Sequence, residues 1–146
     1  MQIRKILVPV DFSPQSEVAL MSAIDLAKTL GASITLLHAY EIPVYTLPDG
    51  AWTLPAAQAT ALADDAQRAL DELVKKYAWA GVPITAKLCR GAPYEEITRG
   101  ATETDADLVV IATHGRTGLA HLFLGSVAER VVRTSPVPVL TIRSMK

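Results

Sequence analysis

The sequence predicts an α/β fold in which a five-stranded parallel sheet is covered by helices on both faces. Five short apolar runs alternate along the chain with longer stretches of helical periodicity, a pattern typical of strands joined by crossover helices. The chain has 146 residues, of which 50% are hydrophobic and only 5% aromatic. This length matches the roughly 100–200 residues of one domain, so we expect residues 1–146 to form a single domain.

Strands are predicted where apolar and β-branched residues run together. The first run is apolar almost throughout, which indicates a strand buried on both faces of the sheet. The third run alternates apolar and polar residues, which fits a strand near a sheet edge. The five predicted strands span residues 3–10, 33–39, 82–88, 107–112 and 137–142.

Helices are predicted from their periodicity and from the residues at their ends. Ser13 followed by Pro14 is typical of an N-cap and a first helical position, and Gly31 is typical of a helix end. Residues 41–55 contain three prolines and an Asp–Gly pair, so a loop is expected there. The four predicted helices span 14–30, 56–80 (closed by Gly81), 94–104 and 126–134, the last opening at Gly125–Ser126.

Charge and cysteine content exclude several classes of protein. The net charge is −1, so there is no general electrostatic attraction to nucleic acid or to an anionic membrane. The single cysteine, Cys89, excludes a disulfide scaffold. No apolar run approaches the roughly 20 residues of a membrane-spanning helix, and the first residues lack the apolar stretch of a secretory signal. We therefore expect a cytoplasmic protein with no nucleic-acid or membrane partner.

The predicted topology also indicates where a ligand would bind. Ligands of parallel α/β sheets lie beyond the carboxyl ends of the strands, where the strand order reverses. This rule directs attention to the turn from Pro9 to Ser13, the segment after Ala39 and the loop after Ala112.

The loop after Ala112 carries the clearest chemical signal. Gly115 permits close approach of the backbone to a ligand, and Gly125–Ser126 opens a helix whose free N–H groups suit a phosphate. The Ser126 hydroxyl can add a hydrogen bond and Arg116 a positive charge. These residues predict a polyphosphate site, in which valine at position 125 would obstruct the phosphate with little loss of fold.

The alternative is an ordinary strand–loop–helix connection that uses glycines for turns and Ser126 as the helix cap. Neither common nucleotide fingerprint is present. Gly125–Ser126 lacks the preceding lysine of a Walker loop, and no glycine lies in the segment Val10-Asp11-Phe12-Ser13-Pro14 that follows the first strand.

Asp11 is the second candidate, because it lies at the carboxyl end of the first predicted strand. A carboxylate there could hydrogen-bond a ribose or help to hold a divalent cation. The alternative is that Asp11 only accepts N–H bonds from the turn and favours the helix start electrostatically.

The histidines and the cysteine form no catalytic or metal-binding pattern. His38 lies within an apolar strand and is interpreted as a hydrogen-bonded core histidine. His114 lies on the predicted phosphate loop with no nucleophile–base order around it, and His121 has no visible partner in the sequence. Three scattered histidines and one cysteine lack the spacing of a zinc site. No catalytic residue is predicted.

Three segments form a recognisable set: Ile6-Leu7-Val8-Pro9-Val10-Asp11-Phe12-Ser13, Ile34-Thr35-Leu36-Leu37-His38-Ala39, and Thr113-His114-Gly115-Arg116-Thr117-Gly118 continuing through Leu124-Gly125-Ser126-Val127-Ala128-Glu129. Taken together, they resemble the universal stress protein family over nearly the whole chain.

The resemblance implies a Rossmann-like three-layer α/β/α fold with strand order 3-2-1-4-5, and a site for ATP with Mg²⁺ or Mn²⁺. Asp11 would reach the ribose or the metal bound to the nucleotide, Ala39 would offer backbone groups to adenine, and the residues from Gly125 onward would line the phosphates. The implied nucleotide-binding residues are Pro9, Val10, Asp11, Ala39, Ala112, His114, Gly115, Arg116, Gly125, Ser126 and Val127.

One position departs from the pattern of the ATP-binding branch of this family. That branch is marked by Gly-x2-Gly-x9-Gly-Ser/Thr. Gly115 and Gly125–Ser126 fit the pattern, but Ala112 replaces its first glycine. The extra methyl group is expected near the ribose, where it would weaken binding without abolishing it.

The favoured hypothesis is a homodimeric ATP-binding module of the stress response, with at most slow ATP hydrolysis. A hydrolase or phosphoryl-transfer enzyme is one alternative, with Asp11, His114 and Arg116 as its available groups. A nucleotide-free dimeric interaction protein is the other, and Ala112 keeps it open. The dimer is expected through the last strand, which runs from Val137 to Ile142 and is apolar although the implied order puts it at a sheet edge.

Overall fold

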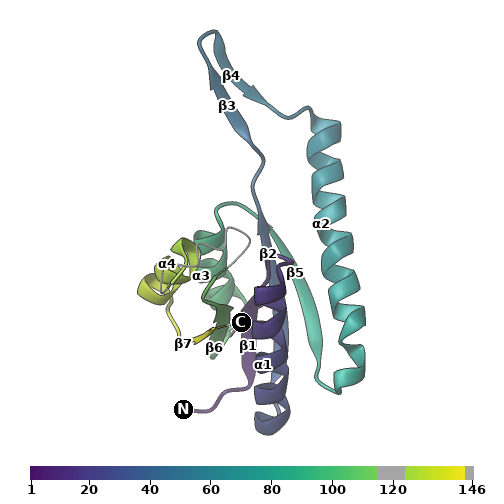
Figure 1. The fold of residues 1–146 in the computed structure, drawn as a ribbon, viewed down its shortest axis with the longest axis vertical. Coiled ribbons are helices and arrows are strands. Elements are labelled where there is room, and N and C mark those ends of the chain that lie inside the picture. The colour runs from purple at the N-terminus through teal and green to yellow at the C-terminus, as the bar shows by residue number, and fades with distance from the viewer. Residues whose placement is uncertain (115–123, 144–146) are drawn as a thin grey trace.

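A computed structural model describes residues 1–114 and 124–143. Its main feature is a five-stranded sheet with the order β5-β2-β1-β6-β7, in which every neighbouring pair is parallel (Figure 1). The strands are β1 (Lys5–Pro9), β2 (Ser33–Tyr40), β5 (Ile84–Arg90), β6 (Leu108–Ala112) and β7 (Val139–Ile142). Counted along the chain, these five strands have the predicted order 3-2-1-4-5.

Helices cover both faces of this sheet, which confirms the three-layer prediction. They are α1 (Pro14–Leu30), α2 (Ala56–Lys76), α3 (Pro93–Glu103) and α4 (Ser126–Thr134). Leu20 of α1 and Leu70 of α2 are fully buried in the core on one face, whereas Ile97 of α3 and Val131 of α4 are buried on the other. Figure 1 shows these two pairs of helices on opposite sides of the sheet.

The ends of α1 follow from the predicted capping residues. The Ser13 side chain accepts a hydrogen bond from the backbone N–H of Ser16 (3.2 Å), and Pro14 occupies the first helical position. Gly31 ends the helix in the left-handed conformation, with φ of 66°. Capping therefore fixes where α1 begins, directly after the turn that contains Asp11.

Helix α2 is shorter than the predicted span of 56–80. It ends at Lys76, and a single 3₁₀ turn, η1 (Ala78–Ala80), continues the chain to Gly81, whose φ is 71°. Tyr77 and Ala80 are both buried in this stretch. The apolar periodicity therefore continued past the α-helix because the following turn is also packed against the core.

The prediction of a loop over residues 41–55 is wrong. The segment forms an antiparallel hairpin of β3 (Val44–Leu47) and β4 (Gly50–Thr53), joined by a two-residue turn at Pro48 and Asp49. The prolines fall outside both strands, where they remove no hydrogen bond from the ladder. In Figure 1 the hairpin projects away from the sheet, near the first turns of α2.

The remaining differences are small shifts of element ends. The third predicted strand, 82–88, is β5 at 84–90, and the last strand begins at Val139 because Pro138 precedes it. Among the described residues, no helix is both long and apolar enough to cross a membrane.

Candidate functional site

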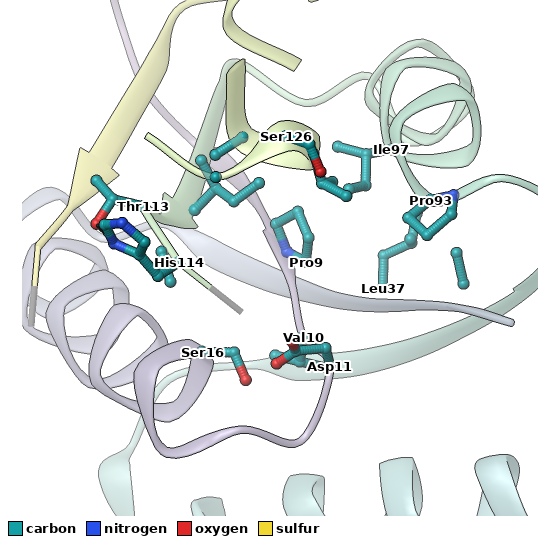
Figure 2. Close-up of a pocket in the computed structure, with 16 residues that line it drawn as sticks. Pro9, Val10, Asp11, Ser16, Leu37, Pro93, Ile97, Thr113, His114 and Ser126 are labelled. Atoms are coloured by element: carbon teal, nitrogen blue, oxygen red, sulfur yellow. Dashed lines mark hydrogen bonds between the residues drawn. The ribbon is translucent and has the colours of Figure 1, made fainter. Parts of the chain in front are cut away.

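A cavity of about 250 Å³ lies at the carboxyl ends of β1, β2 and β6, beside the first turns of α3 and α4 (Figure 2). This is the edge at which ligands of parallel α/β sheets bind. Its lining residues are Pro9, Val10, Asp11, Ser16, Leu37, Ala39, Pro93, Ile97, Ile111, Ala112, Thr113, His114, Gly125, Ser126, Val127 and Ala128.

The cavity brings together every predicted site residue that the structure describes. These nine residues are Pro9, Val10, Asp11, Ala39, Ala112, His114, Gly125, Ser126 and Val127. In Figure 2, Asp11 lies on one side of Pro9 and Ser126 on the other. Gly115 and Arg116, like Gly118 and His121, fall in 115–123, outside the described residues. The turn after β1 and the start of α4, 115 positions apart, thus line one cavity.

The carboxylate of Asp11 is held within its own turn. Its Oδ1 accepts hydrogen bonds from the backbone N–H of Ser13 (3.0 Å) and from the Ser13 hydroxyl (2.5 Å). The hydrogen bonds within the turn, which were the alternative interpretation of Asp11, are therefore present. Asp11 is nevertheless only half-buried and also lines the cavity.

The start of α4 forms part of the cavity wall. Gly125 is the N-cap, with no side-chain capping bond, so the interpretation of Ser126 as the cap is wrong: Ser126 is the first helical residue and is exposed. The first N–H groups of a helix have no acceptor within that helix. They and the positive end of the helix dipole can hold an anion at this position.

Gly125 is required by a close approach of two backbone segments. Its N–H donates to the carbonyl oxygen of Thr113 (2.6 Å), and a Cβ atom at Gly125 would lie 2.9 Å from the same oxygen. A larger residue there would press on the protein's own backbone. The expectation that Gly125→Val causes little loss of fold is therefore wrong, whereas the expected obstruction of a phosphate stays a prediction.

The floor of the cavity is apolar and was mostly missed by sequence reasoning. It is formed by side chains from three elements: Leu37 of β2, Ile97 of α3 and Ile111 of β6. Each also belongs to the buried core, so the sequence pattern marked them as core residues only. The seven lining residues outside the prediction are Ser16, Leu37, Pro93, Ile97, Ile111, Thr113 and Ala128. The sequence held one indication of the residues from α3: the helix predicted after the third strand begins at the same edge of the sheet as the candidate site.

Ala112 is the last residue of β6, where it is paired with Ile142 of β7. It is buried, with 8% of its surface exposed, and it lines the cavity. Position 112, where the motif of the ATP-binding branch would have glycine, therefore belongs to the wall of this site, and the methyl group of Ala112 occupies space there.

The ionisable side chains among the described lining residues are Asp11 and His114. His114 has its Nδ1 atom 3.0 Å from the Thr113 hydroxyl. Within the described residues, no group of three or more His, Cys, Asp or Glu side chains could hold a metal ion. The arrangement offers an apolar floor for a ring, backbone N–H groups for an anion and a carboxylate for hydroxyl groups.

Comparison with known proteins identifies the family. The model of the universal stress protein family matches residues 2–143. Universal stress protein MJ0531 of Methanocaldococcus jannaschii is 36% identical over 145 residues, which cover 98% of this chain and 84% of that relative. The structure of universal stress protein UspA from Lactobacillus plantarum superimposes with a TM-score of 0.82 at 24% identity, covering 98% of this chain and 99% of the other.

A second similar structure contains a nucleotide. It is a universal stress protein in complex with cAMP, with a TM-score of 0.74 and 26% identity, covering 99% of this chain and 100% of the other. The family match over nearly all residues and the close relative agree with the fold and with the three sequence segments described above. The chain belongs to the universal stress protein family.

Proposed function

We propose that this protein binds an adenine nucleotide, ATP, in the cavity between β1 and α4. The observation that carries the proposal is that the Asp11 turn and the N-terminus of α4 form two walls of one cavity. A carboxylate suits ribose hydroxyls, and a helix N-terminus suits phosphates. The similar universal stress protein solved in complex with cAMP supports an adenine nucleotide as the ligand class.

Each part of the nucleotide has a counterpart in the cavity. The adenine ring would lie on the apolar floor near Ala39, where strand β2 offers backbone groups. Asp11 would contact the ribose, or a Mg²⁺ or Mn²⁺ ion carried by the phosphates, since carboxylate oxygen is a ligand that these ions accept. The phosphates would lie against Ser126 and Val127. Gly115 and Arg116 remain proposed phosphate contacts that fall outside the described residues.

We further propose a cytoplasmic, homodimeric stress-response module in which bound ATP affects a surface that partners recognise, with at most slow hydrolysis. Strand β7 supports the dimer, because it lies at the edge of the sheet with Leu140 exposed. An exposed apolar edge strand is a ready surface for pairing, and a two-fold axis would cover both copies at once.

The test uses one added charge at matched positions. Ser126→Asp places a carboxylate at the first position of α4, beside the proposed phosphates, and Ala56→Asp places one at the first position of α2. Both changes are favourable for the helix dipole. Titration calorimetry with ATP and Mg²⁺ should show at least about a tenfold loss of affinity for Ser126→Asp, equivalent to about 1.4 kcal/mol, and none for Ala56→Asp.

Two outcomes would contradict the proposal. The wild-type protein would bind no adenine nucleotide at millimolar ligand, or both variants would change affinity equally. Multiple turnover of ATP by the wild-type protein would instead favour the enzyme alternative. Ala112 is the observation that favours a nucleotide-free interaction protein, because its methyl group lies in the cavity wall.

A further inference from the structure

His38 lies at the far end of β2, next to the turn that carries Asp11. Its Nδ1 atom is 2.7 Å from the carbonyl oxygen of Val10. A carbonyl oxygen only accepts hydrogen bonds, so Nδ1 carries the proton and donates it. The N–H of Val10 in turn donates to the carbonyl oxygen of Leu37 (2.9 Å). Both backbone polar groups of Val10 are therefore tied to two consecutive residues of β2.

The same imidazole also contacts the residue on the other side of Asp11. The ring centroids of His38 and Phe12 are 4.4 Å apart, with the planes inclined by 42°. Phe12 has φ of 63°, in the left-handed region that bulky side chains rarely adopt. Such a conformation persists when the surrounding structure holds it in place. The His38 ring is a neighbour able to do so.

Asp11 thus stands between two residues that His38 holds, one by a hydrogen bond and one by ring packing. The direction of the Asp11 side chain depends on the backbone of these two neighbours. Its Oδ1 is fixed further by Ser13, which is part of the same turn.

We propose that His38 is a positioning residue for nucleotide binding: it holds the Val10–Phe12 turn so that the Asp11 carboxylate meets the ribose. This inference rests on the proposed nucleotide site and adds to it a specificity for the ribose hydroxyls. His38 itself is absent from the residues that line the cavity, so it acts through Asp11. The hydrogen bond expected of His38 is confirmed, with the Val10 carbonyl as its partner. The expected place in the core is not, because His38 is half-buried and belongs to neither core cluster.

The experiment compares ATP with 2′,3′-dideoxy-ATP, which lacks both ribose hydroxyls, by titration calorimetry. The wild-type protein should bind ATP about tenfold more tightly, as expected for one hydrogen bond to a charged group. His38→Leu removes the donor, and the ratio of the two affinities should fall to below about threefold. His38→Asn keeps an N–H donor close to the position of Nδ1 and should restore the ratio. Thr35→Val, on the same strand, is the matched control and should leave the ratio unchanged.

Comparing the two ligands separates positioning from a general structural role, because a damaged fold would weaken both ligands alike. Asp11→Ala should also abolish the discrimination, and adding His38→Leu to it should cause no further loss of ATP affinity, since both act on one contact. If His38→Leu does not fold, His38→Gln takes its place. Its amide lies one bond farther from the backbone than that of asparagine, so it also removes the donor from the position of Nδ1.

The outcomes distinguish this inference from the proposed function. A wild-type protein that binds neither ligand contradicts nucleotide binding itself. A wild-type protein that binds ATP and dideoxy-ATP equally, or a folded His38→Leu variant that retains the full ratio, overturns the role of His38 and leaves nucleotide binding intact.

Discussion

The hydroxyl of Tyr77 donates a 2.5 Å hydrogen bond to Oε1 of Glu17, 60 positions earlier in the chain. Lys76 pairs with the same carboxylate. These contacts join the end of α2 to the first turn of α1, directly after the turn that contains Asp11. The end of α2 is thereby attached to α1 next to the candidate site.

Tyr77→Phe should destabilise the fold by about 1 kcal/mol, because it removes one partly buried hydrogen bond and leaves the packed ring in place. Urea denaturation at pH 7 measures the loss. Tyr45→Phe changes an exposed tyrosine of the hairpin and should have no effect. Equal stability of wild type and Tyr77→Phe would show that the bond makes no net contribution.

The same bond predicts a dependence on alkaline pH. Burial, and then the hydrogen bond to Glu17, raise the pKa of Tyr77 from 10.0 to about 12. The folded state therefore holds this proton more tightly than the unfolded state. Its contribution to stability is complete below pH 10 and is lost as the pH rises from 10 towards 12. The stability difference between wild type and Tyr77→Phe should shrink across that interval, and a constant difference would contradict the assignment.

Gly125→Ala should lower the melting temperature, since its Cβ atom would lie 2.9 Å from the carbonyl oxygen of Thr113. Overpacking of this kind costs about 1–3 kcal/mol. Differential scanning calorimetry gives the measurement. An unchanged melting temperature would show that the two segments can separate, and would make position 125 usable for testing phosphate contacts.

Ala112→Gly should strengthen ATP binding by up to about tenfold, because one methyl group in a binding site is worth about 1 kcal/mol or more. The strand should lose roughly 0.5–1 kcal/mol of stability. Ala86→Gly in β5 makes the same change away from the cavity and should alter stability alone. If calorimetry finds equal ATP affinity in wild type and Ala112→Gly, the methyl group is not an obstacle.

Leu140→Lys should shift the proposed dimer towards monomer in light scattering, because it puts a charge on the exposed edge strand β7. The control is Leu30→Lys at the end of α1, where leucine has nearly the same exposure, 43% against 41% for Leu140. A dimer that survives Leu140→Lys would place the contact on another surface.

Among the described residues, chymotrypsin should cleave the hairpin first, after Tyr45 or Trp52. Both rings are about half exposed, and within the described residues β3 and β4 pack chiefly against each other. An isolated two-stranded hairpin is marginally stable, so it should open more often than the sheet. Mass spectrometry of early fragments identifies the site. First cleavage after Trp79, which is more exposed but lies between buried Tyr77 and Ala80, would contradict this order.

The sheet could be predicted because burial determines its sequence pattern. Leu7 and Val109 have no exposed surface, and positions buried to this degree in a parallel sheet form nearly continuous apolar runs. The edge strand β5 was placed two residues early, because exposed and half-buried positions constrain its ends less strongly. The hairpin was missed for the opposite reason: none of its described side chains belongs to the core clusters, so Pro43, Pro48 and Pro55 dominated the interpretation.

The polar half of the candidate site could also be predicted, since Asp11 and Ser126 stand out at strand and helix ends. Its apolar half could not. Leu37 and Ile97 serve the core and the cavity at once, and one side chain type satisfies both roles. The sequence identified Ala112 as the position that departs from the motif. Only the structure shows that Ala112 pairs with Ile142 and lines the cavity.

The hydrogen bond between Gly125 and Thr113 closes the base of the segment that joins β6 to α4. The two residues that flank this connection, Thr113 and Gly125, therefore lie next to each other. The described part of the fold therefore sets where the first turn of α4 lies, because Gly125 is anchored to the end of β6 through the Thr113 carbonyl.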